Sequence, residues 1–206
     1  YSLGSRQVLI TGSTFHGNAA TGDGGNPGDG GNGGALGVDG AAREVRICGS
    51  RFLENTANAY GAGFFSVMYD DSSLTELIAT TFEGNRNPGP DQFAGGAYVQ
   101  GGPFEIRDST FRANEANGVG GLFLGPQATG ELSNCTFTEN VANTDYPRVM
   151  REYAEAGTQL IVGEIFGVEQ EARARRATSI SRLAVRIGAM SGVEPQLFAS
   201  VFTLCR

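Results

Sequence analysis

The sequence lacks several features on which common functional sites and membrane anchors depend. It has no tryptophan, one histidine and three cysteines. Cys48, Cys135 and Cys205 are too few for a framework of disulfides, and none lies in the Cys-x-x-Cys spacing of a metal site. No apolar run reaches the roughly 18 residues that a membrane-spanning helix needs. We therefore expect no transmembrane segment and assign no metal ligands.

A basic face is missing as well. The formal net charge is −7, and a phosphate backbone is bound by a basic surface, so nucleic acid is not an expected partner. The one basic cluster, Arg173 with Arg175 and Arg176, is interpreted as the solvated face of a helix. The chain also lacks an initiating Met and a signal peptide, and it opens as if already inside a repeat. This beginning predicts a mature product or a fragment.

Glycine, in contrast, is abundant, with 32 of 206 residues, and so we looked first for an internal repeat. Five segments align on a phenylalanine. Each has an aliphatic residue five positions before the Phe, a small residue two before it and an asparagine three after it. The segments are Ile10–Asn18, Ile47–Asn55, Leu77–Asn85, Ile106–Asn114 and Leu132–Asn140.

Glycines followed by a short apolar run separate these segments. The runs are Gly33–Leu36, Gly61–Phe65, Gly95–Val99 and Gly120–Leu124. Each unit holds short strands but cannot bury its apolar side chains alone, whereas stacked units bury a continuous core. Stacking places equivalent strands about 4.8 Å apart with parallel hydrogen bonding. A β-sandwich has no reason to repeat identical residues at identical offsets.

The repeat therefore predicts an all-β fold, a right-handed parallel β-helix of about five coils over residues 1–143. The five phenylalanines should stack inside the coil, beside an Ile/Leu ladder and an asparagine ladder. The asparagines are expected at a corner, in the left-handed conformation, with each amide bonded to the same amide one coil away. The glycines are expected to let the backbone turn into the next strand without a Cβ clash.

The pairing of Phe-x-x-Asn with Gly-Gly-Ala and an aliphatic residue resembles the polymorphic outer-membrane-protein repeat. That repeat is found in chlamydial surface adhesins and in many large secreted bacterial proteins. The motif is also similar to the wider right-handed β-helix superfamily that includes pectate lyases. The resemblance covers about residues 5–143 and implies a passenger-like region that is secreted or displayed at the outer membrane of a bacterial cell.

The repeat stops after Asn143, where no further glycine pair follows. Asp145 as an N-cap and Pro147 in the first turn predict a helix start. The spacing of Ile180, Leu183 and Ile187 predicts a second helix. Residues 144–206 are thus predicted to form a C-terminal helical segment. It either caps the last coil or serves as an assembly helix that binds a partner, and a different reading frame is a third alternative.

Candidate catalytic residues are few. Asp70-Asp71 resembles the Asp-Asp step of polygalacturonases, but the further His and Arg/Lys motifs of that family are absent, and a solvated turn is the preferred interpretation. His16 lies at a position that the other copies fill with Leu53, Glu83, Arg112 and Thr138, which predicts an ordinary surface residue. We assign no catalytic or cofactor-binding residue, and an enzyme is the less favoured interpretation.

One loop offers possible metal chemistry. Asp23, Asp29 and Asp39 lie in or near the glycine-rich segment Thr21–Gly34, and with backbone carbonyls they could bind Ca²⁺. The segment does not match the glycine-aspartate nonapeptides of calcium-loaded β-rolls in register. A flexible insertion loop without a cofactor is therefore preferred.

The leading hypothesis is an extracellular or cell-surface module with a structural or adhesive role and no catalytic activity. Its ligand would be an unidentified surface protein or glycan, bound through an exposed sheet face or the long loops. One alternative is a pectate-lyase-like protein that binds or cleaves polysaccharide. Another is a subunit of a larger extracellular assembly, which self-associates through the solenoid ends or the C-terminal helix.

Overall fold

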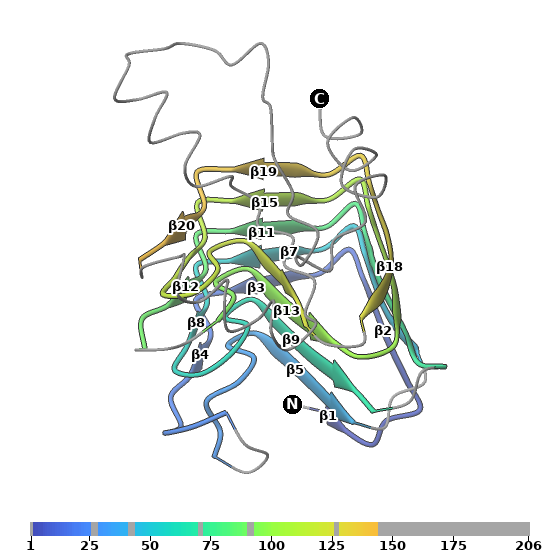
Figure 1. The fold of residues 1–206 in the computed structure, drawn as a ribbon, viewed down its shortest axis with the longest axis horizontal. Helices are drawn as coiled ribbons and strands as arrows, with labels where there is room; N and C mark the ends of the chain where they lie inside the picture. Colours follow the sequence, from blue (N-terminus) through green and yellow to red (C-terminus); the bar gives the residue numbers. More distant parts are fainter. Residues whose placement is uncertain are drawn as a thin grey trace, which may run out of the picture.

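The chain forms a parallel β-solenoid (Figure 1). The computed structural model describes residues 2–25, 29–40, 44–69, 72–89, 93–125 and 128–143. Within these residues the strands stack into four parallel sheets, each five strands deep. The all-β, parallel β-helix fold predicted from the repeat is confirmed. The predicted helical segment 144–206 lies outside the described residues.

Each coil contributes one strand to each sheet. Sheet A contains β1 (Ser2–Leu3), β5 (Leu36–Gly40), β9 (Phe64–Met68), β13 (Ala97–Gln100) and β17 (Leu122–Leu124). Sheet B contains β2 (Gln7–Thr11), β6 (Glu44–Cys48), β10 (Leu74–Ile78), β14 (Pro103–Arg107) and β18 (Thr129–Ser133). Sheet C contains β3 (Thr14–His16), β7 (Arg51–Leu53), β11 (Thr81–Glu83), β15 (Thr110–Arg112) and β19 (Thr136–Thr138). Sheet D contains β4 (Ala19–Ala20), β8 (Thr56–Ala57), β12 (Arg86–Asn87), β16 (Glu115–Ala116) and β20 (Val141–Ala142).

The repeated phenylalanines form one continuous stack inside sheet C. Neighbouring rings lie 4.8 to 4.9 Å apart between centroids, with interplanar angles of 14° or less. This spacing equals the separation of hydrogen-bonded strands, so the rings stack because the backbones do. The three central rings, Phe52, Phe82 and Phe111, are fully buried. The predicted phenylalanine ladder is therefore confirmed.

Sheet B shows the alternation of a half-buried strand. In β6, Val45 and Ile47 point into the core while the residues on either side of them are more exposed. Ile47 is in register with Ile10 and Leu77, so the predicted aliphatic ladder is confirmed. In the other inward row the bulky Phe104 lies next to Gly130. A Cβ at Gly130 would overlap the backbone carbonyl oxygen of Phe104 and also come 2.9 Å from its side chain, so a larger residue does not fit there.

The asparagines form a directional ladder beside the phenylalanines. The Nδ2 group of Asn55 donates to Asn85 Oδ1 across 2.9 Å, and the same link joins each of the other neighbouring pairs. The second Nδ2 hydrogen returns to a phenylalanine carbonyl of the preceding coil, as from Asn85 to Phe52. The buried amides of Asn55, Asn85 and Asn114 are thus fully hydrogen-bonded. This ladder was predicted.

The conformation assigned to the asparagines was wrong. The left-handed residue at this corner is the one before each asparagine, with φ between 52° and 66° at Gly17, Glu54, Gly84, Ala113 and Glu139. The asparagines themselves are not left-handed, since their amides must point along the stack. A second left-handed ladder precedes each Phe strand, at Gly12, Gly49, Ala79, Asp108 and Asn134. Each Phe strand therefore lies between two sharp bends.

The repeated glycine pairs are required by close packing of successive coils. A Cβ on Gly96 would lie 2.4 Å from the carbonyl oxygen of Gly121 and 3.2 Å from the Phe111 ring. Gly63 has the equivalent environment, 2.5 Å from the carbonyl oxygen of Gly96. Real Cβ atoms do not approach a backbone oxygen so closely. The second glycine of each pair therefore lets the chain cross the phenylalanine and asparagine ladders.

Candidate functional site

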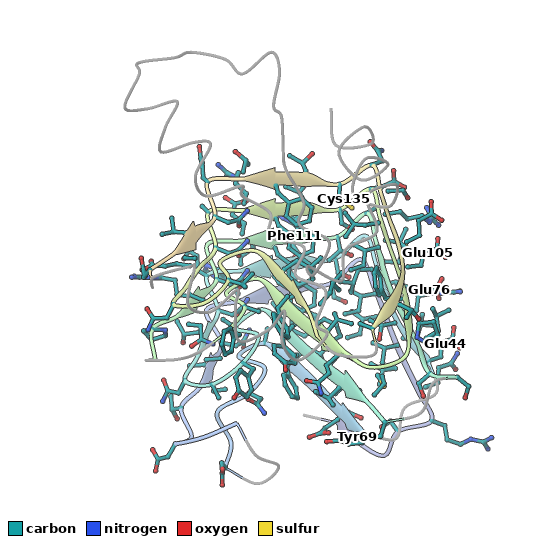
Figure 2. All side chains as sticks on the ribbon, in the orientation of Figure 1. Glu44, Tyr69, Glu76, Glu105, Phe111 and Cys135 are labelled. Carbon is teal, nitrogen blue, oxygen red and sulfur yellow. The ribbon has the colours of Figure 1, made fainter. Side chains whose placement is uncertain are left out.

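The outer face of sheet B carries a row of carboxylates. Glu76, Glu105 and Glu131 are in register on adjacent strands, and Arg46 precedes them in the same row. Figure 2 shows Glu44, Glu76 and Glu105 along the outer side of this sheet, with Phe111 in the interior of the coil. Like charges on neighbouring strands repel one another, so the row needs counter-charges.

Two arginines supply that charge. Arg46 Nε lies 2.6 Å from Glu76 Oε2, and the hydrogen bond with Glu76 raises the pKa of Arg46 above its usual value. Arg107 contacts Glu105 across 2.9 Å and Asp108 across 3.2 Å. Its hydrogen bond to Asp108, followed by the one to Glu105, raises the pKa of Arg107. Glu76 and Glu105 are thus each held by a guanidinium group.

Sheets C and D continue this pattern of pairing between coils. Arg112 donates to Glu83 on the neighbouring strand and also lies 3.9 Å from Glu139. Arg86 contacts Glu115 across 3.0 Å, again one coil away. Exposed pairs of this kind contribute little stability one by one. On each of these two sheets they place opposite charges next to each other on neighbouring strands.

The outer face of sheet A is different, because it is aromatic. Phe65 and Tyr98 are in register, with ring centroids 5.4 Å apart, and Phe123 follows at 4.6 Å from Tyr98. Tyr60 and Phe93, from the connections between coils, lie over them. These rings form a second apolar cluster, separate from the solenoid core.

A tyrosine and an aspartate meet at one end of this face. Tyr69 follows β9 and is 71% exposed. A Cβ on Gly40 would lie 2.9 Å from its ring, so the ring rests on the backbone there. The buried Asp39 accepts a hydrogen bond from the Tyr69 hydroxyl. Partial desolvation and the Asp39 carboxylate together raise the pKa of Tyr69 above 10.0.

The residues considered from the sequence are not brought together into one site. His16 is exposed, as predicted, and lies 3.2 Å from Glu54 of the next coil. Asp70 and Asp71 lie outside the described residues. Cys135 is buried in the position that serine or threonine fills in the other coils, and Cys48 lies in an outer row of sheet B, between Thr11 and Ile78.

The calcium hypothesis gains no geometric support. Asp39 lies on β5 beside Tyr69 and not in the glycine-rich loop. That loop is closed on itself by backbone hydrogen bonds, from Gly22 to Gly30 and from Gly31 to Gly24. Among the residues that the structure describes, no three His, Cys, Asp or Glu side chains are grouped to hold a metal ion.

The sequence contains one signal for the aromatic cluster. Four of the five residues of the strand Phe64–Met68 are apolar, so apolar side chains fall on both of its faces. The whole strand is buried, as is typical of a strand covered on both faces, whereas β6 and β14 of sheet B alternate. Nothing local could have paired Tyr69 with Asp39, because they come from different coils.

No family model, curated protein or solved structure matches this chain. The resemblance to the outer-membrane-protein repeat therefore rests on the motif alone. No helix in the described part of the chain is long and apolar enough to cross a membrane.

Proposed function

We propose that the chain is a structural or adhesive β-solenoid module, secreted or displayed at a cell surface, without a catalytic role. The observation that carries this proposal is the pairing of charges between successive coils on sheets B, C and D. A glycosidase needs a carboxylic acid with a raised pKa. The carboxylates of these pairs are instead engaged by the guanidinium groups of Arg46, Arg86 and Arg112.

The use of the repeated residues supports the same proposal. Phenylalanine, asparagine and the second glycine of each pair are all engaged in ladders or close contacts inside the solenoid. They specify a rigid rod and leave recognition to residues that do not repeat. The motif's resemblance to the repeats of surface adhesins is the reason that we propose a location outside the cell.

Two measurements test the proposal. Beads coated with the folded protein should be retained under flow on cell or matrix surfaces, and beads coated with the unfolded chain should not. Incubation with a panel of uronic-acid polymers should leave them intact. Release of unsaturated products would contradict the non-catalytic role, and equal retention of both bead types would contradict adhesion by the folded module.

A second candidate function, polysaccharide binding, is favoured by Tyr69 and Asp39. The exposed ring of Tyr69 offers a stacking surface to a sugar, and its hydroxyl is held in place by the buried Asp39. Titration calorimetry against neutral and acidic oligosaccharides tests it. Binding should be lost in Tyr69→Ala and retained in Arg86→Gln, a surface variant on another sheet. Binding that survives Tyr69→Ala would exclude this site.

A further inference from the structure

The sequence contains two asparagine–glycine pairs, Asn32-Gly33 and Asn117-Gly118. Such a pair can modify itself without an enzyme, because the glycine nitrogen can attack Cγ of the asparagine side chain. Ammonia leaves and a five-membered succinimide forms, which water then opens to aspartate or isoaspartate. Glycine permits the attack because it has no Cβ to obstruct it. The nitrogen must lose its proton to attack, so a hydrogen bond from its N–H slows the reaction.

The fold holds the first pair in an unreactive arrangement. Asn32 is only 5% exposed, and its Nδ2 group donates to the Gly25 carbonyl across 2.7 Å. Its Oδ1 accepts from the Tyr60 N–H across 3.2 Å. The Gly33 N–H donates to the Tyr60 carbonyl across 2.9 Å. Both the attacking nitrogen and the attacked side chain of this pair are therefore fixed by hydrogen bonds.

The second pair is held differently. Asn117 is half-buried, and its Nδ2 group donates to the Gly89 carbonyl of the preceding coil across 2.6 Å. Among the residues that the structure describes, the Gly118 N–H donates to no backbone carbonyl. The nitrogen that would attack Asn117 thus lacks, within this part of the chain, the bond that restrains Gly33.

A comparison with another coil shows that this arrangement is particular to Asn117. The strand register places Asn58 and Asn117 at the same point of their coils, two coils apart. Asn58 is followed by Ala59, whose N–H donates to the Gly31 carbonyl across 2.9 Å. At Asn58 a methyl group and a hydrogen bond therefore both hinder the reaction that Gly118 allows.

We propose that Asn117 is a self-modification site, which the folded protein converts to aspartate and isoaspartate. The bond between the Gly118 nitrogen and Asn117 Cγ forms, and the bond between Cγ and Nδ2 breaks. The proton of the Gly118 N–H leaves with the ammonia, and one water molecule is consumed when the ring opens. Nothing is oxidised or reduced, and water is the only other reactant. This inference does not depend on the proposed function.

The modification should weaken a contact between coils. The amide that donates to the Gly89 carbonyl becomes a carboxylate, which cannot donate and repels that oxygen. In the isoaspartate form the main chain also gains one methylene group. Val119, two residues further on, is fully buried and accepts a hydrogen bond from the Gly95 N–H across 3.1 Å. A lengthened chain displaces Val119 from this position.

Ageing the folded protein at mildly alkaline pH tests the proposal, with the chain unfolded in urea as the reference. Peptide mapping by mass spectrometry, with isoaspartate labelled by its methyltransferase, measures both pairs in each sample. In urea, residues 32 and 117 should react at similar rates. In the folded protein, residue 117 should react at least about tenfold faster than residue 32, the factor expected when one backbone hydrogen bond must first be broken.

Two results would overturn the proposal. One is a folded protein in which Asn117 stays intact while the unfolded chain reacts, because the fold would then protect the site. The other is an equal rate at Asn32 and Asn117 in the folded protein.

Gly118→Ala is the matched variant. Gly118 is not left-handed, so alanine suits its backbone. In urea this variant should slow the reaction of Asn117 to that of Asn58, which is naturally followed by alanine. A variant that reacts as fast as the unmodified chain would exclude the succinimide route.

Asn117→Asp reproduces one product of the reaction. This variant and the aged protein should both unfold at lower urea concentration than the fresh protein. An aged, fully modified protein with an unchanged urea midpoint would contradict the weakened contact with Gly89.

Discussion

The Asn85 side-chain amide donates a hydrogen bond to Asn114 Oδ1 across 2.9 Å, and the Asn85 backbone N–H donates to the same oxygen across 3.1 Å. Each asparagine in the middle of the solenoid thus binds the coil after it twice and the coil before it through Nδ2. Because Asn114 Oδ1 accepts from both the backbone N–H and the side-chain amide of Asn85, the backbone turn and the side-chain ladder are held together by the same oxygen. The unit that stabilises the fold is therefore the contact between coils and not the single coil.

Asn85→Ala should be strongly destabilising. It removes the hydrogen bonds to Asn114 and Phe52 and leaves the backbone N–H and one Nδ2 hydrogen of Asn55 without an acceptor in a buried position, while the other Nδ2 hydrogen keeps the Phe15 carbonyl. We expect a loss of about 3 kcal/mol or more in the free energy of unfolding, measured by urea denaturation. Asn18→Ala, at the exposed end of the ladder, is the control and should cost about 1 kcal/mol. Equal losses at the two positions would show that the ladder is not cooperative.

Gly96→Ala should destabilise the solenoid although the substitution is small. The added methyl group meets the carbonyl oxygen of Gly121 at 2.4 Å, and backbone must move to relieve the contact. We expect a loss of about 2 kcal/mol or more. Gly49→Ala is the control: a Cβ there meets nothing within 4 Å, so its cost is only the strain of alanine at φ 58°, about 1 kcal/mol, which Ala79 already bears in the equivalent bend at φ 48°. Thermal unfolding of both variants measures the difference, and a Gly96→Ala protein as stable as Gly49→Ala would contradict close packing of the coils.

Acid should weaken the bend at Asp108. Its hydrogen bonds from Asn134 and, secondarily, Arg107 lower the pKa of Asp108 below 3.8. The contribution to stability is therefore complete above pH 3.8 and is lost as the pH falls through the lowered folded-state pKa. In Asp108→Asn this part of the acid sensitivity should disappear, and asparagine fits the left-handed bend because Asn134 fills the same position. Denaturant midpoints at pH 5 and below 3.8 provide the test. If the stability of Asp108→Asn depended on pH in the same way as that of the unmodified protein, the assigned role of Asp108 would be contradicted.

Asn87→Ala should change stability by less than about 1 kcal/mol. Asn87 interrupts a row in sheet D that is otherwise alanine, at Ala20, Ala57, Ala116 and Ala142. Its Nδ2 group donates to the Ala59 carbonyl and, across 3.4 Å, to the Phe93 carbonyl. Its buried Oδ1 has no hydrogen-bond partner among the described residues, so removing the side chain loses weak bonds but also relieves an unsatisfied acceptor. Asn87→Asp places an oxygen where the donor was and should cost several times more. Chemical denaturation of the two variants side by side separates these effects, and a severe loss in the alanine variant would show that the bond to Ala59 dominates.

The ladders could be predicted because each depends on one residue type at one offset. Phe52, Asn55 and Ile47 recur at fixed spacing, and parallel stacking follows from that spacing alone. The bends could not be placed in the same way. Glu54 and Ala113 adopt a left-handed conformation that neither residue favours. The asparagine directly after each of them is hydrogen-bonded to the asparagine of the next coil, and this contact imposes the bend.

The candidate surfaces were less accessible to prediction. Arg46 and Glu76 lie in different copies, and their contact depends on a register that only the stacked coils define. The same is true of Tyr69 and Asp39. The motif describes what coils have in common, whereas the surfaces consist of what differs between them.

The direction of the asparagine ladder also has an electrostatic consequence. Along the ladder each amide oxygen accepts from the asparagine of the coil before it, and one Nδ2 hydrogen donates to the asparagine of the coil after it, while the other hydrogen returns to the preceding coil. The bond dipoles therefore add along the axis and polarise one another. Asn18 presents the negative pole of this column and Asn140 the positive pole. The solenoid is a polar rod, with opposite preferences for nearby ions at its two ends.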